Sequence, residues 1–524
     1  MLTIEQMTPE QKIGRVLCAR RTNVAEDLEF TLELIRNQAC GCVQVQVNDK
    51  AEALIRTLRE AADYPLLIIN DMENGFAPSG LPSVTSATLA ACKNREYTRA
   101  FAAAIARDAR ATGFSGCWSP VVDILRTPSD KLGTLRKAGD TAEAVTDFAR
   151  DILEVFASYR FQGSCKHYPG GHTSGADTHM TNATNTVDEA ELLGVDLVPY
   201  LTMHREGLLQ GVMVDHAFYP QIDPDYPASL SKKVIGILRR AGYDGLIYTD
   251  SLAMMAILQR YGEAGAMVLA LNAGNDIILP NYRTPTKEVY EMMLKAYKNG
   301  EIDEARLDEA VRHVMAAEAW CAEAPTAPVP VPENIEEILH AVSRDCVSTD
   351  CAEGLSPAID PTERRLFVVL TEQGFRMDGP AQEISFGNFY HPQRVIDAIR
   401  ERFPNAEITT LPEFPSANAN DIVLTKATAH DKVVFVSFCM TSCYLGADRM
   451  TRRVEAMIDA LTASGKLEAL VHFGNPLATR ELGLRPARTL FGYNAPAAQV
   501  YAFDVLAGAI PAKGTVPYPH MMAL

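Results

Sequence analysis

A short apolar strand runs into a carboxylate at Gly245-Leu246-Ile247-Tyr248-Thr249-Asp250-Ser251. Its β-branched and aromatic side chains favour a buried strand, and Asp250 stands at the carboxyl end of that strand. Similar apolar runs recur along the chain, and amphipathic segments lie between most of them. From these runs we expect strands near residues 13–19, 40–47, 65–70, 115–118, 162–166, 210–214, 245–249 and 275–279.

Helix-like segments, such as 96–111, 141–158 and 231–241, separate most of these strands. Repeated strand–helix alternation predicts a parallel sheet, and eight such units would close a (β/α)8 TIM-like barrel over residues 1–325. In such barrels the active site forms at the carboxyl ends of the strands. Polar residues that stand at or just past these ends are Asp71, Lys166, Asp215 and Asp250.

A proline-rich stretch then interrupts the alternation. Residues 325–332 include Pro325, Pro328, Pro330 and Pro332, which stiffen the backbone and remove hydrogen-bond donors. We therefore expect a linker and a connecting helix over 326–360. Beyond it, apolar runs at 365–370, 421–424, 432–438 and 469–473 lie among helix-like segments at 392–402, 451–464 and 496–507. This pattern predicts a smaller α/β sandwich domain over residues 361–524.

Composition narrows the class of protein. A chain of 524 residues exceeds what one hydrophobic core usually serves, and 47% apolar with 22% charged residues is ordinary for a globular protein. The net charge of −17 argues against nucleic acid as a partner. The N-terminus shows no signal-peptide pattern, and no segment approaches the ~18 apolar residues needed to span a bilayer. We therefore expect a cytoplasmic protein, with its eleven cysteines as reduced thiols.

A second polar cluster carries the chemistry. Lys166-His167-Tyr168-Pro169-Gly170-Gly171-His172 is followed shortly by Asp177-Thr178-His179. A two-step glycosyl transfer needs one group to attack the sugar carbon and another to move the proton. Asp250 suits the first task. His179, with Asp177 as its orienting partner, suits the second because imidazole titrates near neutral pH.

Simpler explanations exist for each residue. Asp250 could cap the helix that follows it, and a single loop histidine such as His179 is often only a solvated group. The fixed spacing between Lys166 and the Asp177–His179 pair favours the catalytic interpretation. The motifs of nucleotide binding, zinc proteases and dinucleotide binding do not occur, so we expect no metal and no organic cofactor.

The segment from Lys166 to His179 resembles glycoside hydrolase family 3, in particular its β-N-acetylglucosaminidase branch. That branch carries Lys-His-Phe-Pro-Gly-His-Gly, four variable residues and then Asp-Ser-His, and the spacing is kept here without insertion. Further family-like segments follow the same order along nearly the whole chain. They lie at 70–75, 119–123, 135–140, 214–217, 227–231, 249–254, 473–476 and 491–493.

The resemblance implies a site and a mechanism. Asp250 would be the nucleophile, His179 the acid/base and Asp177 its dyad partner, all supplied by the barrel itself. The residues that resemble the family's sugar-binding set are Asp71, Arg136, Lys166, His167 and, with a less defined role, His216. The implied activity is that of a retaining exo-acting β-glycosidase, a β-N-acetylhexosaminidase acting on small soluble glycosides or oligosaccharides.

Two departures from the family pattern leave alternatives open. The usual Gly-His-Gly is Gly170-Gly171-His172 here, and the usual Asp-Gln-Glu-Gly-Gly-Arg becomes 71–76 without its arginine. These departures motivate a non-catalytic sugar sensor as one alternative. Glycoside phosphorolysis is another, because a histidine acid/base carries no fixed negative charge and phosphate could replace water, and β-glucosidase-type activity on the same scaffold is a third. The sensor is disfavoured because all three catalytic positions are intact. The sequence leaves the sugar, the aglycone and the oligomeric state open.

Overall fold

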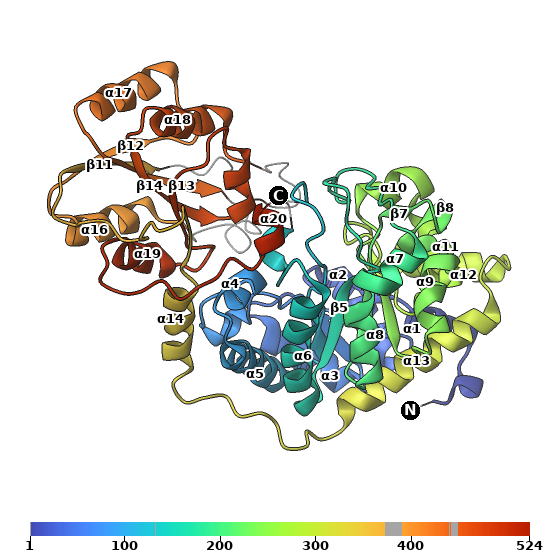
Figure 1. The fold of residues 1–524 in the computed structure, drawn as a ribbon. Coiled ribbons are helices and arrows are strands. Elements are labelled where there is room, and N and C mark those ends of the chain that lie inside the picture. The colour runs from blue at the N-terminus through green and yellow to red at the C-terminus, as the bar shows by residue number, and fades with distance from the viewer. Residues whose placement is uncertain (1, 131–132, 372–389, 440, 442–448, 524) are drawn as a thin grey trace. The chain divides into compact units, whose positions relative to one another are not determined.

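The computed structural model describes residues 2–130, 133–371, 390–439, 441 and 449–523. The chain divides into two compact units (Figure 1). The first unit contains residues 1–83, 98–129 and 141–335, and the second contains 84–97, 130–140 and 336–524. The second unit therefore includes two short segments from the N-terminal half of the sequence.

A curled parallel sheet forms the centre of the first unit. Within the described residues it has seven strands in the order β1-β2-β3-β4-β5-β6-β9. Their bounds are β1 Cys18–Ala19, β2 Cys42–Gln44, β3 Leu67–Asn70, β4 Gly116–Cys117, β5 Gln162–Tyr168, β6 Gly211–Val214 and β9 Leu246–Thr249. Parallel bridges from Ile277 to Tyr248 and from Ile278 to Leu17 connect the two edges. The sheet is thus barrel-like, as the strand–helix alternation predicts.

Helices surround this sheet (Figure 1). They are α1 Pro9–Arg15, α2 Ala25–Arg36, α3 Ala51–Ala61, α5 Arg95–Thr112, α6 Ala142–Ser158, α7 Glu189–Glu191, α8 Val198–Arg205, α9 Lys232–Arg240, α10 Met255–Tyr261, α11 Glu263–Ala273, α12 Thr286–Lys298 and α13 Glu304–Ala322. Side-chain caps fix two of the predicted starts, because Thr141 accepts from Ala144 N–H and Ser231 accepts from Val234 N–H. A hairpin of β7 (Phe218–Tyr219) and β8 (Asp223–Pro227) lies between β6 and α9.

The first and eighth predicted strands differ from expectation. Residues 13–15 belong to α1, because Thr8 caps that helix in a capping box with Gln11 and Pro9 occupies its first position. Only the end of the 13–19 run pairs as β1. The 275–279 run makes isolated bridges and no continuous strand.

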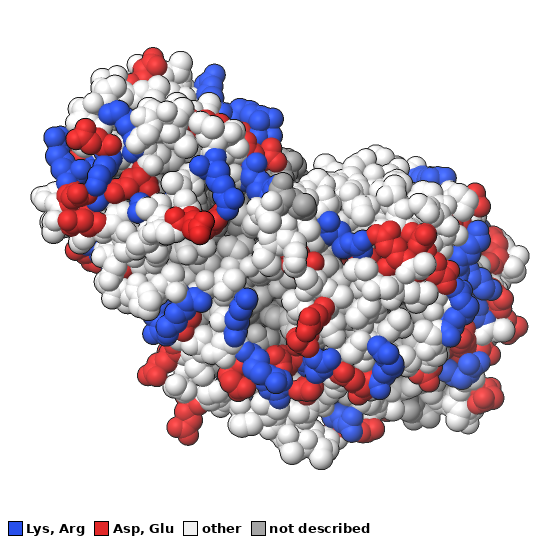
Figure 2. All heavy atoms as spheres, viewed as in Figure 1, with Lys and Arg blue, Asp and Glu red and all other residues white. Residues whose placement is uncertain are grey.

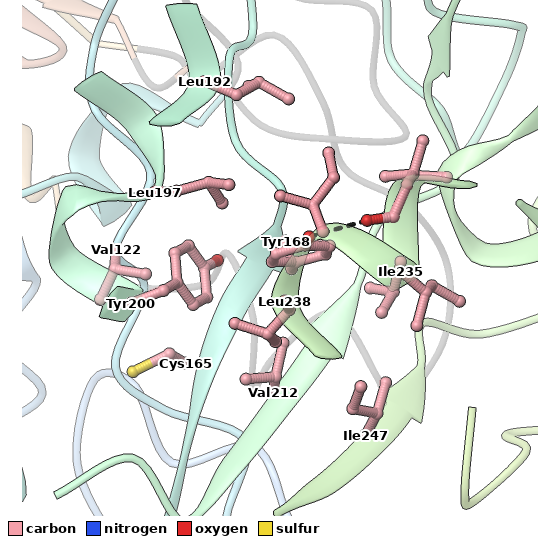
Figure 3. Close-up of a cluster of buried hydrophobic side chains, with 14 of the residues drawn as sticks. Val122, Cys165, Tyr168, Leu192, Leu197, Tyr200, Val212, Ile235, Leu238 and Ile247 are labelled. Atoms are coloured by element: carbon pink, nitrogen blue, oxygen red, sulfur yellow. Dashed lines mark hydrogen bonds between the residues drawn. The ribbon is translucent and has the colours of Figure 1, made fainter. Parts of the chain in front are cut away.

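A cluster of buried side chains joins the sheet to its outer helices. Figure 3 shows side chains of β5, β6 and β9 meeting those of α8 and α9. The rings of Tyr168 and Tyr200 meet edge to face with centroids 5.5 Å apart, and the Tyr168 hydroxyl donates to the carbonyl of Val234 at 2.8 Å. These contacts anchor the end of β5, the strand that also carries Lys166 and His167.

The second unit contains a mixed sheet. Within the described residues its six strands run in the order β10-β15-β14-β13-β11-β12, with β10 antiparallel to β15 and the others parallel. The bounds are β10 Ser348–Cys351, β11 Arg365–Leu370, β12 Ala406–Leu411, β13 Val433–Cys439, β14 Leu467–Gly474 and β15 Arg488–Phe491. This is the α/β sandwich that the alternation of runs and helices predicts.

Helices cover both faces of that sheet, with α17 and α18 on one side and α16 and α19 on the other (Figure 1). The helices of this unit are α4 Ser86–Ala91, α14 Ile335–Asp345, α16 Pro392–Arg402, α17 Ala417–Thr428, α18 Arg452–Ala463, α19 Ala498–Leu506 and α20 Pro519–Ala523. The apolar run 421–424 lies inside α17 and not in a strand. Ser416 caps this helix, and Val423 is the buried member of the run.

Segments 84–97 and 130–140 form hydrogen bonds with residues near the C-terminal end of the second unit. The hydroxyls of Thr85 and Thr88 donate to Oδ1 of Asn494 at 2.8 and 2.9 Å. The hydroxyl of the fully buried Tyr518 donates to the carbonyl of Lys137 at 2.7 Å. Residues separated by several hundred positions therefore share one core.

The surface carries both signs of charge despite the net charge of −17. Basic and acidic side chains are interspersed over the face drawn in Figure 2. Among the described helices, none combines the length and apolar character that crossing a membrane requires. The cysteines that the structure describes are all free thiols, and most are buried.

Candidate active site

Polar residues gather where the parallel strands of the first unit end. Asp71 directly follows β3, Lys166 and His167 lie at the end of β5, and Asp250 directly follows β9. Asp215 likewise follows β6. Because carboxyl ends of parallel barrel strands meet at one face, these side chains share one end of the sheet.

Asp250 lies in an electropositive setting. Its Oδ1 accepts a hydrogen bond from the Ser251 N–H at 2.6 Å, and its Oδ2 lies 4.0 Å from Nε2 of His167. Burial would raise the carboxyl pKa, but the charges of nearby histidines, His167 first, outweigh burial and lower the pKa to about 2. The Asp250 carboxylate is therefore ionised at neutral pH, which is the state a nucleophile needs.

His179 and Asp177 form a hydrogen-bonded pair. Nδ1 of His179 lies 2.7 Å from Oδ1 of Asp177, and the same oxygen accepts the His179 N–H at 3.0 Å. The His179 carbonyl accepts from the N–H of Met255, the first residue of α10, at 3.3 Å. Since α10 begins five residues after Asp250, the pair is tied to the segment that carries that carboxylate.

The ammonium group of Lys166 is buried between two carboxylates. Its Nζ lies 2.5 Å from Oδ1 of Asp71 and 2.6 Å from Oε1 of Glu73. A buried charge is stable only when it is paired, and here the pairing is double. The side chain of Asp71 is 56% exposed, so Lys166 orients a carboxylate that still faces solvent and can accept hydrogen bonds from hydroxyl groups.

His167 is fixed by a buried carboxylate. Nδ1 of His167 lies 2.8 Å from Oδ2 of Asp123, and the His167 N–H donates to Oδ1 of Asp123 at 2.9 Å. Burial would raise the pKa of Asp123, but the charges of His172 and His167 hold the pKa well below its usual range. An ionised Asp123 therefore orients the ring whose Nε2 lies near Asp250.

His216 is fully buried and supports the backbone beside Asp250. Its Nδ1 lies 2.7 Å from the Ser229 hydroxyl and its Nε2 lies 3.0 Å from the carbonyl oxygen of Ser251. A carbonyl can only accept, so Nε2 carries the hydrogen and Nδ1 accepts from the hydroxyl. Burial also lowers the pKa of His216, which favours this neutral form. The structure thus buries His216 beside the backbone that follows Asp250, and its assignment as a substrate-binding residue stays a prediction from the resemblance.

Arg136 ends the short 3-10 helix η3 (Thr134–Arg136), which belongs to the second compact unit. Its assignment as a sugar-binding residue stays a prediction from the resemblance. The remaining candidates, Asp71, Lys166, His167, Asp177, His179 and Asp250, all lie in the first unit.

Arg20 belongs to the site but was not singled out from the sequence. It follows β1, and its guanidinium donates to the Ser251 hydroxyl at 2.6 Å and to the Pro280 carbonyl at 2.8 Å. The guanidinium also lies over the exposed ring of Tyr282, 5.3 Å from the ring centroid. Its place directly after an apolar run was the available signal, the same signal that identified Asp71.

The arrangement offers an ionised carboxylate, a carboxylate-supported imidazole and hydrogen-bonding groups for hydroxyls. Among the residues that the structure describes, no three His, Cys, Asp or Glu side chains are grouped to hold a metal ion. This set of groups is suited to nucleophilic attack with proton transfer.

Comparisons with known proteins agree with this description. The profile described as "Glycosyl hydrolase family 3 N terminal domain" matches residues 10–317. A beta-N-acetylglucosaminidase/beta-glucosidase of Cellulomonas fimi is 27% identical over 334 residues, which span 60% of this chain and 58% of that enzyme. A solved family 3 beta-N-acetylglucosaminidase from Paenibacillus sp. str. FPU-7 has a TM-score of 0.80 and 25% identity, covering 98% of this chain and 99% of that one. A solved beta-glucoside phosphorylase has a TM-score of 0.81 at 17% identity, covering 99% and 96% of the two chains, a likeness of fold alone.

Proposed function

Because this chain belongs to glycosyl hydrolase family 3, we propose that it is a retaining, exo-acting β-N-acetylhexosaminidase. Asp250 is the nucleophile and His179, supported by Asp177, is the acid/base. The observation that carries the proposal is the pairing of an ionised Asp250 with a hydrogen-bonded Asp177–His179 dyad on connected segments.

The reaction proceeds in two displacements at the anomeric carbon. An oxygen of Asp250 attacks that carbon while the imidazolium of His179 gives its Nε2 proton to the departing glycosidic oxygen. This step releases an alcohol and leaves a glycosyl ester on Asp250. Neutral His179 then removes a proton from water, whose oxygen attacks the anomeric carbon and frees the carboxylate. Two inversions together retain the configuration.

The terminal sugar is bound by the side chains around the nucleophile. Asp71, oriented by Lys166, accepts hydrogen bonds from hydroxyls, and His167 contacts the sugar from its place near Asp250. The resemblance also implies a donor role for Arg136, which belongs to the second unit. Preference for an N-acetylated sugar is supported by the Lys166-to-His179 spacing and by the activity named for the Paenibacillus protein. The Cellulomonas protein is also named a beta-glucosidase, so glucosides are the competing substrate class.

The test is covalent trapping of the intermediate. A 5-fluoro glycosyl fluoride of N-acetylglucosamine should add one sugar to the peptide containing Asp250. In a separate experiment with a β-glycoside that turns over, NMR should show that the sugar is released first as the β anomer. Asp250→Asn should form no adduct. Asp244→Asn is the matched control, because this exposed carboxylate lies at the opposite end of β9. An α product, or an adduct on another residue, would contradict the proposed mechanism.

Phosphorolysis is the second candidate for the same site. The acid/base is a histidine, which carries no fixed negative charge and so does not repel an incoming phosphate. Phosphate would then replace water in the second step and release a sugar 1-phosphate. Measuring products by ³¹P NMR, with and without phosphate, decides between the two. A sugar 1-phosphate as main product would assign phosphorolysis, and free sugar at an unchanged rate would assign hydrolysis.

A further inference from the structure

His172 lies between two buried carboxylates and has no role in the mechanism described above. Its Nε2 lies 3.3 Å from Oδ1 of Asp123 and its Nδ1 lies 4.0 Å from Oδ2 of Asp215. Both carboxylate side chains are only 5% exposed. The ring therefore connects the segment after β4 with the segment after β6.

The glycine before His172 explains why the ring comes from this position. Gly171 adopts a φ of +70°, a conformation that favours glycine. A Cβ at Gly171 would lie 2.8 Å from Cγ2 of Val187 and 2.9 Å from Cδ2 of Leu192, so buried neighbours would have to move. A side chain does not fit at residue 171, and residue 172 is the next that can reach the carboxylates.

Asp123 connects His172 with the site. Its Oδ1 faces Nε2 of His172, and its Oδ2 faces Nδ1 of His167 at 2.8 Å. Nε2 of His167 lies 4.0 Å from Oδ2 of Asp250. The contacts thus run continuously from His172 through Asp123 and His167 to the nucleophile.

Carboxylates surround His172 on more than one side. The ring faces Asp123 and Asp215, and it also lies within the electrostatic influence of Asp196, whose own partner is Arg126. Asp123 is shared with His167. Arg126 is itself shared with Glu191, so the carboxylates named here are only partly neutralised by it, and an imidazolium at residue 172 adds a positive charge beside Asp123 and Asp215.

We propose that His172 is a positioning residue: its imidazolium neutralises Asp123 and Asp215 and so holds His167 in the orientation that binds the sugar beside Asp250. Without that charge, Asp123 loses a partner, and His167 is held by a carboxylate that is itself less constrained. A hydrogen bond to a charged group is typically lost at a cost of about 10- to 100-fold in an equilibrium constant. We expect a loss of that order in kcat/KM, mostly through a higher KM.

The test is a double-mutant cycle with His172→Gln and His167→Ala, assayed on an aryl glycoside with an activated leaving group. Glutamine keeps polarity and removes the charge. If His172 acts through His167, His172→Gln should cost about 10- to 100-fold alone and little in the His167→Ala background. His204→Gln is the matched control, because His204 lies on α8 with its ring against Tyr243, 5.6 Å between centroids. Equal thermal unfolding midpoints exclude misfolding as the cause.

A pH profile adds a readout that a purely structural role would not change. Loss of the His172 proton should contribute to the alkaline fall of kcat/KM in the unmodified enzyme, and His172→Gln should remove that contribution. Additive losses in the cycle, or an unchanged pH profile in His172→Gln, would overturn the proposal.

The proposal rests on the proposed function, since it assumes that His167 binds the sugar. The two can fail separately. Absence of turnover by the unmodified enzyme on all aryl glycosides would refute the function. The coupling is then judged by NMR of the resting protein labelled with ¹³C-histidine. His172→Gln should shift the His167 ring signal and its titration, whereas His204→Gln should not, and an unmoved His167 signal would refute the coupling.

Discussion

Replacing Asp177 by asparagine removes a charge and keeps the shape of the side chain. Oδ1 of Asp177 accepts hydrogen bonds from Nδ1 and from the backbone N–H of His179, at 2.7 and 3.0 Å. An amide oxygen can accept both bonds, so the loop should keep its geometry. What is lost is the charge that favours the imidazolium form. A hydrogen bond to a charged partner contributes about 1.5–3 kcal/mol, which corresponds to about one to two pH units.

The sign of the effect follows from the role of the ring. The imidazolium of His179 is the general acid, and the Asp177 carboxylate stabilises that protonated form. The variant should therefore lose its acid at a lower pH, and the alkaline limb of kcat/KM should move down by about one to two pH units. The assay compares pH profiles for a poor and an activated leaving group. The activated substrate should respond less, because its departure needs little protonation.

Asp188→Asn provides the matched control for this experiment. Asp188 lies in the same connection between β5 and α8, but its carboxylate caps α7 by accepting from the Glu191 N–H at 2.8 Å. Its replacement should leave the pH profile unchanged. An alkaline limb that stays in place or moves upward in Asp177→Asn would refute the reasoning, and so would an equal shift for both leaving groups.

Three further predictions concern neighbouring groups. His179→Ala should slow the cleavage of alkyl glycosides by about 10²–10⁴-fold but affect activated aryl glycosides far less. Added azide should restore turnover of the aryl glycosides. Equal losses on both kinds of substrate, without rescue by azide, would refute the proton-transfer role. His167→Gln removes a group that helps to lower the pKa of Asp250 to about 2. The Asp250 pKa should therefore rise by about one unit, and the acid limb of the kcat/KM profile should move to higher pH. An acid limb that does not move would contradict this reasoning. Tyr168→Phe removes the 2.8 Å hydrogen bond to the Val234 carbonyl and should cost about 0.5–1.5 kcal/mol of unfolding free energy, measured by denaturant titration, whereas an unchanged midpoint would show that the bond contributes nothing.

Local signals carried most of the fold prediction. Strands ended where apolar runs met polar residues, and helices began at capping residues such as Thr141 and Ser231. The exceptions have local causes as well. Thr8 and Pro9 start a helix whose apolar face resembles the beginning of a strand, and Val423 gives α17 a buried residue inside a short apolar run. Apolar runs of this length do not distinguish strand from helix.

The sequence could indicate those candidate site residues that stand at the carboxyl end of a predicted strand. Asp71 and Asp250 stand at strand ends, where chemistry in such barrels occurs. Arg20 lacked any motif, and its role appears only once the backbone brings it to Ser251. The burial of His216 was equally invisible, because a histidine near a motif can face the site or support it from behind. Distinguishing these cases requires tertiary contacts.

The division of the chain has a consequence for biosynthesis. Thr85 and Thr88 leave the ribosome about four hundred residues before Asn494, the residue whose side chain satisfies their hydroxyls. Until then, Val84, Ala87 and Leu89, all buried in the complete chain, have no finished core to enter. Vectorial synthesis therefore cannot complete the two units one after the other. A gene truncated after residue 335 should yield a polypeptide that exposes this segment and depends on chaperones or aggregates.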